Sequence, residues 1–308
     1  MSGLSCSLRL FIVRLDQRLG SPYADLKSLR ENRAMEILDF RVRPQTDYFY
    51  RNIYPNTMPA YAPYIRLFDM SEEDGRLIRK PIEQSIHEMA QQGISKAVIF
   101  AGEAQGNKEV YKVCSQYPET YVGLAGINIK EGVTKGVEDL EQALDEFGLK
   151  GLSLGPFASG IAATDSRYYP LYSLLERKGK ILQCHSAIHY NPDVPLDIAD
   201  PQHLDRIAVD FPNLKIVMSH AGFGFGDVGT TVAIRHPNMY IDLSGLHPKY
   251  LPERLIGLSN TLLKKKVIFG TNYPCLNFEI VHAWKRVIRE DNQPLFFAQN
   301  AKRVLGID

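Results

Sequence analysis

Short apolar runs rich in β-branched residues alternate with longer amphipathic segments from about residue 36 to the end of the chain. In segments such as VEDLEQALDEFG (137–148) and HLDRIAVDFPN (203–213), apolar residues recur every three or four positions, as they do in a helix that buries one face. Eight of the short runs have the length and composition of buried strands. They are EILDFRV, KAVIFAG, YVGLAGIN, KGLSLGP, ILQCHSA, KIVMSHAG, MYIDLSG and KVIFGTN.

Eight strand-then-helix units in succession predict an α/β fold, a closed (β/α)8 TIM barrel that forms one domain over residues 35–308. A doubly wound open sheet is the alternative. It would need a glycine-rich phosphate-binding turn after its first strand, and RVRPQT at that place is no such turn. Residues 1–34 precede the pattern, and we expect them to form an N-terminal arm or an extra strand.

The longest stretch without the repeat follows the first strand, over residues 43–75. It is rich in tyrosine and proline, which suits a βα loop that covers the active-site end of a barrel. Its aromatic residues would suit a planar or cyclic acid, but they would serve equally well in a packed lid or a subunit contact. A homo-oligomer is therefore possible.

Charge and composition exclude some partners. The chain of 308 residues has 36 Lys+Arg and 35 Asp+Glu, a formal net charge of +1, so no global field favours nucleic acid or an anionic membrane. The apolar run SLRLFIVRL near the N-terminus is too short to span a membrane and lacks a signal-peptide cleavage site. Four cysteines lie far apart without a CxxC pair, as expected of a reduced, cytoplasmic protein.

Polar side chains stand where several of the predicted strands end, which in a parallel barrel is the active-site end. Two histidines at the same level of consecutive strands indicate chemistry more than structure. The candidate residues are Arg41 and Arg43 on the first strand, Glu103 on the second, His185 on the fifth, His220 on the sixth, Asp242 on the seventh and Asn272 on the eighth.

Arg41 and Arg43 are two positions apart and so lie on one face of the first strand. Two buried cations cost several kcal/mol each unless carboxylates or a bound anion neutralise them. Salt bridges to Asp39, Glu103 or Asp242 are one way to do so. Guanidinium groups also bind carboxylates in a bidentate manner, so a small anionic substrate is the other.

The chain resembles the amidohydrolase superfamily, in the branch that includes lactonases and metal-dependent decarboxylases. The resemblance extends over roughly residues 36–307 and depends on five segments in the family's order. These are ILDFRVRP, GLKGLSLGP, DRIAVDFPNLKIVMSHAG, VIFGTNYP and FAQNAKRVLGI.

The resemblance implies a divalent metal held by two histidines of the first strand, the histidine of the fifth strand and an aspartate of the eighth, with the histidine of the sixth strand also at the site. The matching positions here are Arg41, Arg43, His185, Asn272 and His220. Guanidinium groups cannot bind a cation, and an amide cannot act as a base. We therefore expect no cofactor, because the metal-ligand motif is degenerate.

Three functional hypotheses are consistent with the sequence. The first is a metal-independent enzyme that binds a small carboxylate or lactone and acts by hydrolysis or by carbon–carbon lysis such as decarboxylation. In it Arg41, Arg43, Asn272 and Glu103 bind the substrate, and His185, His220 or Asp242 transfers protons. The second is a non-catalytic protein that binds a small acid. The third is a metal-dependent hydrolase with unconventional ligands drawn from the two histidines and the nearby carboxylates.

Overall fold

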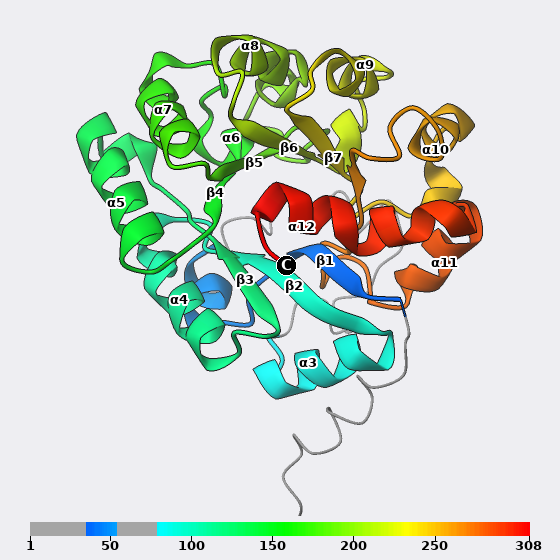
Figure 1. Ribbon diagram of the computed structural model, residues 1–308. Coiled ribbons are helices and arrows are strands. Elements are labelled where there is room, and N and C mark those ends of the chain that lie inside the picture. The colour runs from blue at the N-terminus through cyan, green and yellow to red at the C-terminus, as the bar shows by residue number, and fades with distance from the viewer. Residues whose placement is uncertain (1–34, 54–78) are drawn as a thin grey trace, which may run out of the picture. The chain divides into compact units, whose positions relative to one another are not determined.

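Parallel strands form the centre of the structure, and helices surround them (Figure 1). The computed structural model describes residues 35–53 and 79–308. The arm predicted for residues 1–34 and the part of the tyrosine-rich loop from residue 54 onward lie outside the described residues. Within the described part, the chain forms the (β/α)8 barrel that the alternating pattern predicts, so the predicted fold class is confirmed.

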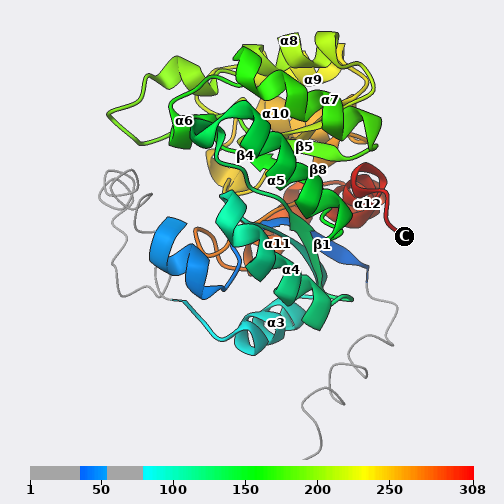
Figure 2. The same cartoon turned by 90° about the vertical axis from the view of Figure 1, so that its left-hand side faces the viewer.

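Each predicted strand segment contains or overlaps an observed strand. The strands are β1 (Ile37–Val42), β2 (Ile94–Phe100), β3 (Tyr121–Leu124), β4 (Gly151–Leu154), β5 (Ile181–His185), β6 (Lys215–Ser219), β7 (Met239–Asp242) and β8 (Val267–Ile268). The helices are α3 (Ile82–Gln91), α4 (Asn107–Gln116), α5 (Val133–Asp145), α6 (Pro156–Ser159), α7 (Tyr169–Arg177), α8 (Gln202–Asp210), α9 (Val228–Arg235), α10 (Glu253–Ser259), α11 (Ile280–Val287) and α12 (Asn300–Leu305). The helices lie outside the strands (Figure 2). Their apolar residues are buried, as amphipathic segments require.

Backbone hydrogen bonds join the strands into a ring. Regular parallel pairing runs from β1 to β3 and from β4 to β8. The first gap is crossed where the Ala125 amide donates to the Gly151 carbonyl at 2.7 Å. The second is crossed where the Asn272 amide donates to the Arg41 carbonyl at 2.8 Å. This second contact joins two of the predicted site residues, one on β1 and the other in the segment after β8.

The short helix α12 covers the N-terminal ends of the strands (Figure 1). Asn300 donates its side-chain amide to the Val267 carbonyl at 2.7 Å, and Lys215 donates to the Val304 carbonyl at 3.3 Å. A hydrophobic cluster packs beneath α12, and the opposite, C-terminal ends of the strands are left to carry the polar side chains. The buried members of this cluster are Leu38, Phe40, Phe49, Val98, Phe100, Val122, Leu124, Ile181, Val217, Ile268, Ala301, Val304 and Leu305.

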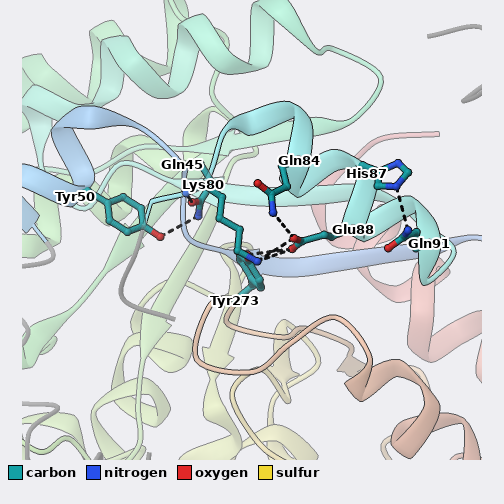
Figure 3. A network of polar contacts seen from close by, with 8 residues as sticks. All are labelled: Gln45, Tyr50, Lys80, Gln84, His87, Glu88, Gln91 and Tyr273. Carbon is teal, nitrogen blue, oxygen red and sulfur yellow. Dashed lines mark hydrogen bonds and ion pairs between the residues drawn. The ribbon is translucent and has the colours of Figure 1, made fainter. Parts of the chain in front are cut away.

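A polar network connects the segment after β1, helix α3 and the segment after β8 (Figure 3). Lys80 forms an ion pair with Glu88 at 2.9 Å, and Glu88 accepts a hydrogen bond from the Tyr273 hydroxyl at 3.3 Å. Gln45 accepts from the Lys80 amide at 2.9 Å and donates to the Tyr50 hydroxyl at 3.1 Å. The network therefore holds together three segments that follow or precede site strands.

No helix of residues 35–53 or 79–308 is long and apolar enough to cross a membrane.

Candidate active site

Arg41 lies near the end of β1, with 9% of its surface exposed. Its Nη1 donates a hydrogen bond to Oε1 of Gln183 at 2.8 Å. The guanidinium carbon lies 4.3 Å from the centre of the Phe100 ring, within the range of a cation–π contact. The structure thus holds a permanent positive charge in a largely dry place at the mouth of the barrel.

Gln183 on β5 connects Arg41 to the acidic side of the site, and sequence reasoning missed it. Its Oε1 also accepts from the Ser153 hydroxyl at 3.0 Å, and its Nε2 donates to Oδ2 of Asp242 at 3.3 Å. A signal was present, because Gln183 precedes His185 by two positions and so lies on the same face of one strand. Gln183 is fully buried, which makes these contacts strong determinants of its orientation.

Asp242 at the end of β7 continues the network toward His220. Its Oδ2 accepts from the Ser219 hydroxyl at 2.7 Å, and its Oδ1 accepts from the Ser244 amide at 2.7 Å. The Ser244 carbonyl in turn accepts from Nδ1 of His220 at 2.6 Å. Asp242 has no exposed surface, so its hydrogen bonds to these groups are shielded from water.

The two strand-end histidines lie against each other, with ring centroids 5.0 Å apart in a T-shaped arrangement. Because a carbonyl oxygen can only accept, His220 carries its hydrogen on Nδ1, and Nε2 has the lone pair. His185 has the opposite tautomer, since its Nε2 lies 3.2 Å from the Ala187 carbonyl. Burial and, next, the Arg41 charge lower the pKa of His220 to about 4. Burial, His220 and Arg41 lower the pKa of His185 well below its usual range.

Among the described residues, three that are not glycine have left-handed backbone conformations. All three lie just after β6 or β8. The φ angles are 66° for His220, 57° for Ala221 and 57° for Asn272. Such conformations cost roughly 1–3 kcal/mol each and concentrate at functional sites. Gly245 allows its backbone to approach both Asn272 and His220 closely. A Cβ at this position would lie 3.1 Å from Nδ2 of Asn272 and 3.4 Å from Nδ1 of His220.

Asn272 and Arg43 adjoin this centre, whereas Glu103 contacts a different segment. Asn272 is 8% exposed, and its Oδ1 is buried without a hydrogen-bond partner among the residues that the structure describes. Arg43 is 5% exposed, and its amide donates to the Tyr273 carbonyl at 2.9 Å. Glu103 follows β2 and accepts from the Tyr48 hydroxyl at 3.1 Å. Its part in substrate binding stays a prediction.

The carboxylates considered as partners for the arginines bond to other groups. Asp39 accepts from the Thr271 hydroxyl at 2.6 Å, from the Thr271 amide at 2.9 Å and from the Arg41 backbone amide at 3.1 Å. Asp242 and Glu103 bond to the groups described above. In the described part of the chain, the observed partners of these three carboxylates are hydroxyl and amide donors of adjoining segments rather than the guanidinium groups.

Complete burial raises the pKa of Asp39 to about 7, against 3.8 for the exposed group. The folded protein therefore keeps this proton up to about pH 7, while the unfolded chain releases it near pH 4. The stability that Asp39 contributes is complete below pH 4 and is lost as the pH rises to 7, at roughly 1.4 kcal/mol for each pH unit. We expect the free energy of unfolding, measured in urea, to fall between pH 5 and 7, and Asp39→Asn to make the fall less steep. Equal slopes for both proteins would contradict this.

A known protein family covers most of the chain. The model of a family described as amidohydrolase matches residues 66–307. A 2-amino-3-carboxymuconate-6-semialdehyde decarboxylase from Dictyostelium discoideum is 22% identical over 238 residues, 66% of each protein, so the match covers just under two thirds of that relative.

Two solved structures share the fold. An uncharacterized TIM-barrel protein from Bordetella bronchiseptica is 24% identical, with a TM-score of 0.76, over 88% of this chain and 98% of that chain. A 5-carboxyvanillate decarboxylase from Novosphingobium aromaticivorans, solved with manganese and 4-hydroxy-3-methoxy-5-nitrobenzoic acid, is 15% identical, with a TM-score of 0.66, over 89% and 96%.

The expectation that no cofactor takes part is wrong in the light of these structures, since solved decarboxylases of this fold hold manganese. The expectation relied mainly on the arginines of β1 and the amide of Asn272. Imidazole nitrogens on β5 and β6 remain, and imidazole is a common ligand of divalent metals.

The residues that the structure describes do not by themselves supply a full set of ligands for that ion. Within residues 35–53 and 79–308, no group of three His, Cys, Asp or Glu side chains could hold a metal. Within the same residues, the unconventional set of His185, His220 and Asp242 or Glu103 is therefore not assembled either.

Proposed function

The chain belongs to the amidohydrolase family, and on that premise we propose that it is a lyase that removes a carboxyl group from a small, anionic carboxylic acid. One observation carries the proposal: the buried Arg41 guanidinium lies at the same end of the barrel as two neutral histidines, His185 and His220. The names of the relatives support decarboxylation as the reaction, because the curated relative and several solved ones are decarboxylases.

Arg41 is the proposed carboxylate-binding residue, with Arg43 and the Asn272 amide beside it. Guanidinium groups match carboxylates in a bidentate manner, and the bond to Gln183 keeps the planar fork of Arg41 oriented. Little water surrounds Arg41, so its attraction for an anion is stronger than that of an exposed arginine. Oδ1 of Asn272, which is unpartnered among the described residues, offers an acceptor for a hydroxyl of the substrate.

His220 is the proposed proton donor. Its pKa of about 4 leaves it neutral in the absence of substrate. A carboxylate bound near Arg41 adds negative charge, which raises the pKa of His220 and allows a proton to bind at Nε2. The carbon–carbon bond then breaks, its electron pair stays on the substrate carbon, carbon dioxide leaves, and the Nε2 proton is transferred to that carbon.

Hydrolysis is the weaker candidate for the same residues. It requires a base that takes a proton from water, and a group with a pKa near 4 is a poor base at neutral pH. Asp242 is fully buried and its oxygens accept bonds from Ser219, Gln183 and Ser244. We propose Asp242 as a positioning residue for His220 rather than as the base.

The experiment is a thermal-shift screen of small carboxylic acids, followed by product analysis of each ligand with and without added manganese, because solved relatives hold that ion. We expect a stabilising acid that loses carbon dioxide. A ligand that stabilises the protein but is recovered unchanged in both conditions would favour the non-catalytic hypothesis. Release of an alcohol and an acid from an ester, or ring opening of a lactone, would favour hydrolysis.

A further inference from the structure

Gln45, two residues beyond Arg43, joins the two ends of the segment between β1 and α3. Its Oε1 accepts a hydrogen bond from the Lys80 amide at 2.9 Å, and its backbone carbonyl accepts one from Nε of Arg79 at 3.2 Å. Its Nε2 donates to the Tyr50 hydroxyl at 3.1 Å and to the Arg43 carbonyl at 3.2 Å. Gln45 is 4% exposed, so water competes little for these bonds. No step of the proposed decarboxylation uses Gln45.

Hydrogen bonds hold the backbone of Arg43 from both sides. The Arg43 carbonyl accepts from Gln45, and the Arg43 amide donates to the Tyr273 carbonyl at 2.9 Å. The Tyr273 hydroxyl donates to Glu88 on α3, and Glu88 forms an ion pair with Nζ of Lys80. The Lys80 amide returns to Gln45, so these five residues form a closed circuit, and Figure 3 shows all of them except Arg43. Because the circuit is closed, a shift of the Arg43 backbone requires that another member move or that a hydrogen bond break.

Tyr273 connects the circuit to the site. Its buried ring stacks on Phe278, with centroids 4.2 Å apart and planes at 10°. The preceding residue, Asn272, donates its amide to the Arg41 carbonyl at 2.8 Å. Two consecutive residues of one segment therefore hold the backbones of both candidate arginines, Arg41 and Arg43.

The charge of Arg43 reaches the site from this circuit. Burial and Arg41 lower the pKa of His220, and the Arg43 charge adds to this effect. Burial raises the pKa of Tyr50, and the Arg43 charge opposes the rise. The Arg43 charge therefore acts both on the proposed proton donor and on the hydroxyl that Gln45 binds. An arginine side chain loses much conformational freedom when it is fixed on an anion, so a backbone that is already held reduces the cost of binding.

We propose that Gln45 is a positioning residue, which holds the backbone of Arg43 so that the Arg43 guanidinium is pre-organised for the carboxylate of the substrate. Gln45 acts through Arg43 and does not touch the substrate. The inference deepens the proposed function and rests on it, because it takes Arg43 as part of the carboxylate site. A loosened Arg43 costs affinity for the acid, whereas the loss of a merely structural bond costs stability alone.

The test is a double-mutant cycle, with benzoate as the probe and calorimetric titration of the full chain as the measurement. Gln45→Met keeps the length of the side chain and removes its hydrogen-bonding groups. We expect it to weaken benzoate binding about tenfold, and Arg43→Met to weaken it about 30-fold or more. In the Arg43→Met protein, Gln45→Met should change the affinity less than about twofold, because the residue through which Gln45 acts is gone.

Urea unfolding of each protein measures the loss of stability separately from the loss of affinity. If Gln45→Met does not fold, Gln45→Glu takes its place in the same cycle. Glutamate keeps the acceptor for the Lys80 amide and removes the donor to the Arg43 carbonyl.

Gln84→Met is the matched control. The Gln84 amide donates to Glu88 at 3.0 Å at the exposed edge of the network, so the substitution makes the same chemical change outside the circuit, and benzoate affinity should not change. Affinity within twofold of the parent protein in Gln45→Met, or an undiminished tenfold loss in the Arg43→Met protein, would overturn the role of Gln45. Benzoate affinity unchanged in Arg43→Met would instead overturn the place of Arg43 in the proposed carboxylate site. No binding of benzoate to the parent protein would overturn both.

Discussion

Replacing His220 by asparagine should lower turnover by about 10²- to 10⁴-fold, the usual loss when a general acid or base is removed. Asparagine is the appropriate replacement for two structural reasons. Its amide can still donate to the Ser244 carbonyl, as Nδ1 of His220 does at 2.6 Å. Asparagine also tolerates the left-handed backbone of this position, where φ is 66°. The substitution should therefore preserve the fold while removing the ionisable ring nitrogen.

The measurement is the decarboxylation rate at saturating acid, together with the urea unfolding curve of each protein. His203→Asn is the control, since it makes the same change at a histidine whose ring nitrogens contact the Thr164 hydroxyl and the Asp197 carbonyl. We expect His220→Asn to keep its affinity for the acid within a few-fold, because Arg41 remains. Turnover within threefold of the parent protein would remove His220 from the mechanism.

Arg41→Met should weaken binding of the acid by roughly two orders of magnitude or more, since breaking a buried charge pair costs about 2–5 kcal/mol. Methionine fills much of the same volume against Phe100 but has no charge and no donors. A second effect follows from electrostatics. Arg41 lowers the pKa of His220, so removing Arg41 should raise that pKa and move the corresponding limb of the pH–rate profile to higher pH.

Arg41→Lys separates the two effects. Lysine keeps the charge near His220 and should leave the pH profile almost in place, but it lacks the planar fork and should recover only part of the affinity. Arg206→Met removes an exposed ion pair with Asp210 on α8 and is the surface control. It should change neither the affinity for the acid nor the pH–rate profile. Unchanged affinity in Arg41→Met would mean that the carboxylate binds elsewhere.

The sequence by itself determined the fold. Hydrophobic periodicity is a local property, and the alternation of β-branched runs with amphipathic segments allowed strands such as β5 and helices such as α8 to be placed before any contact was known. It also indicated the end of the barrel at which polar residues gather. Arg41, His185 and His220 were named from their strand-end positions, and their catalytic and binding roles stay predictions that the substitutions above test.

Only the tertiary structure decided how those residues act on one another. Arg41 and Gln183 are 142 positions apart, and their hydrogen bond depends on the closure of the ring rather than on any local pattern. The raised pKa of Asp39 and the lowered pKa of His220 follow from burial, which is summed over all the surrounding strands. A sequence pattern records which side chains are available, and the packing of distant strands sets their charge, tautomer and partners.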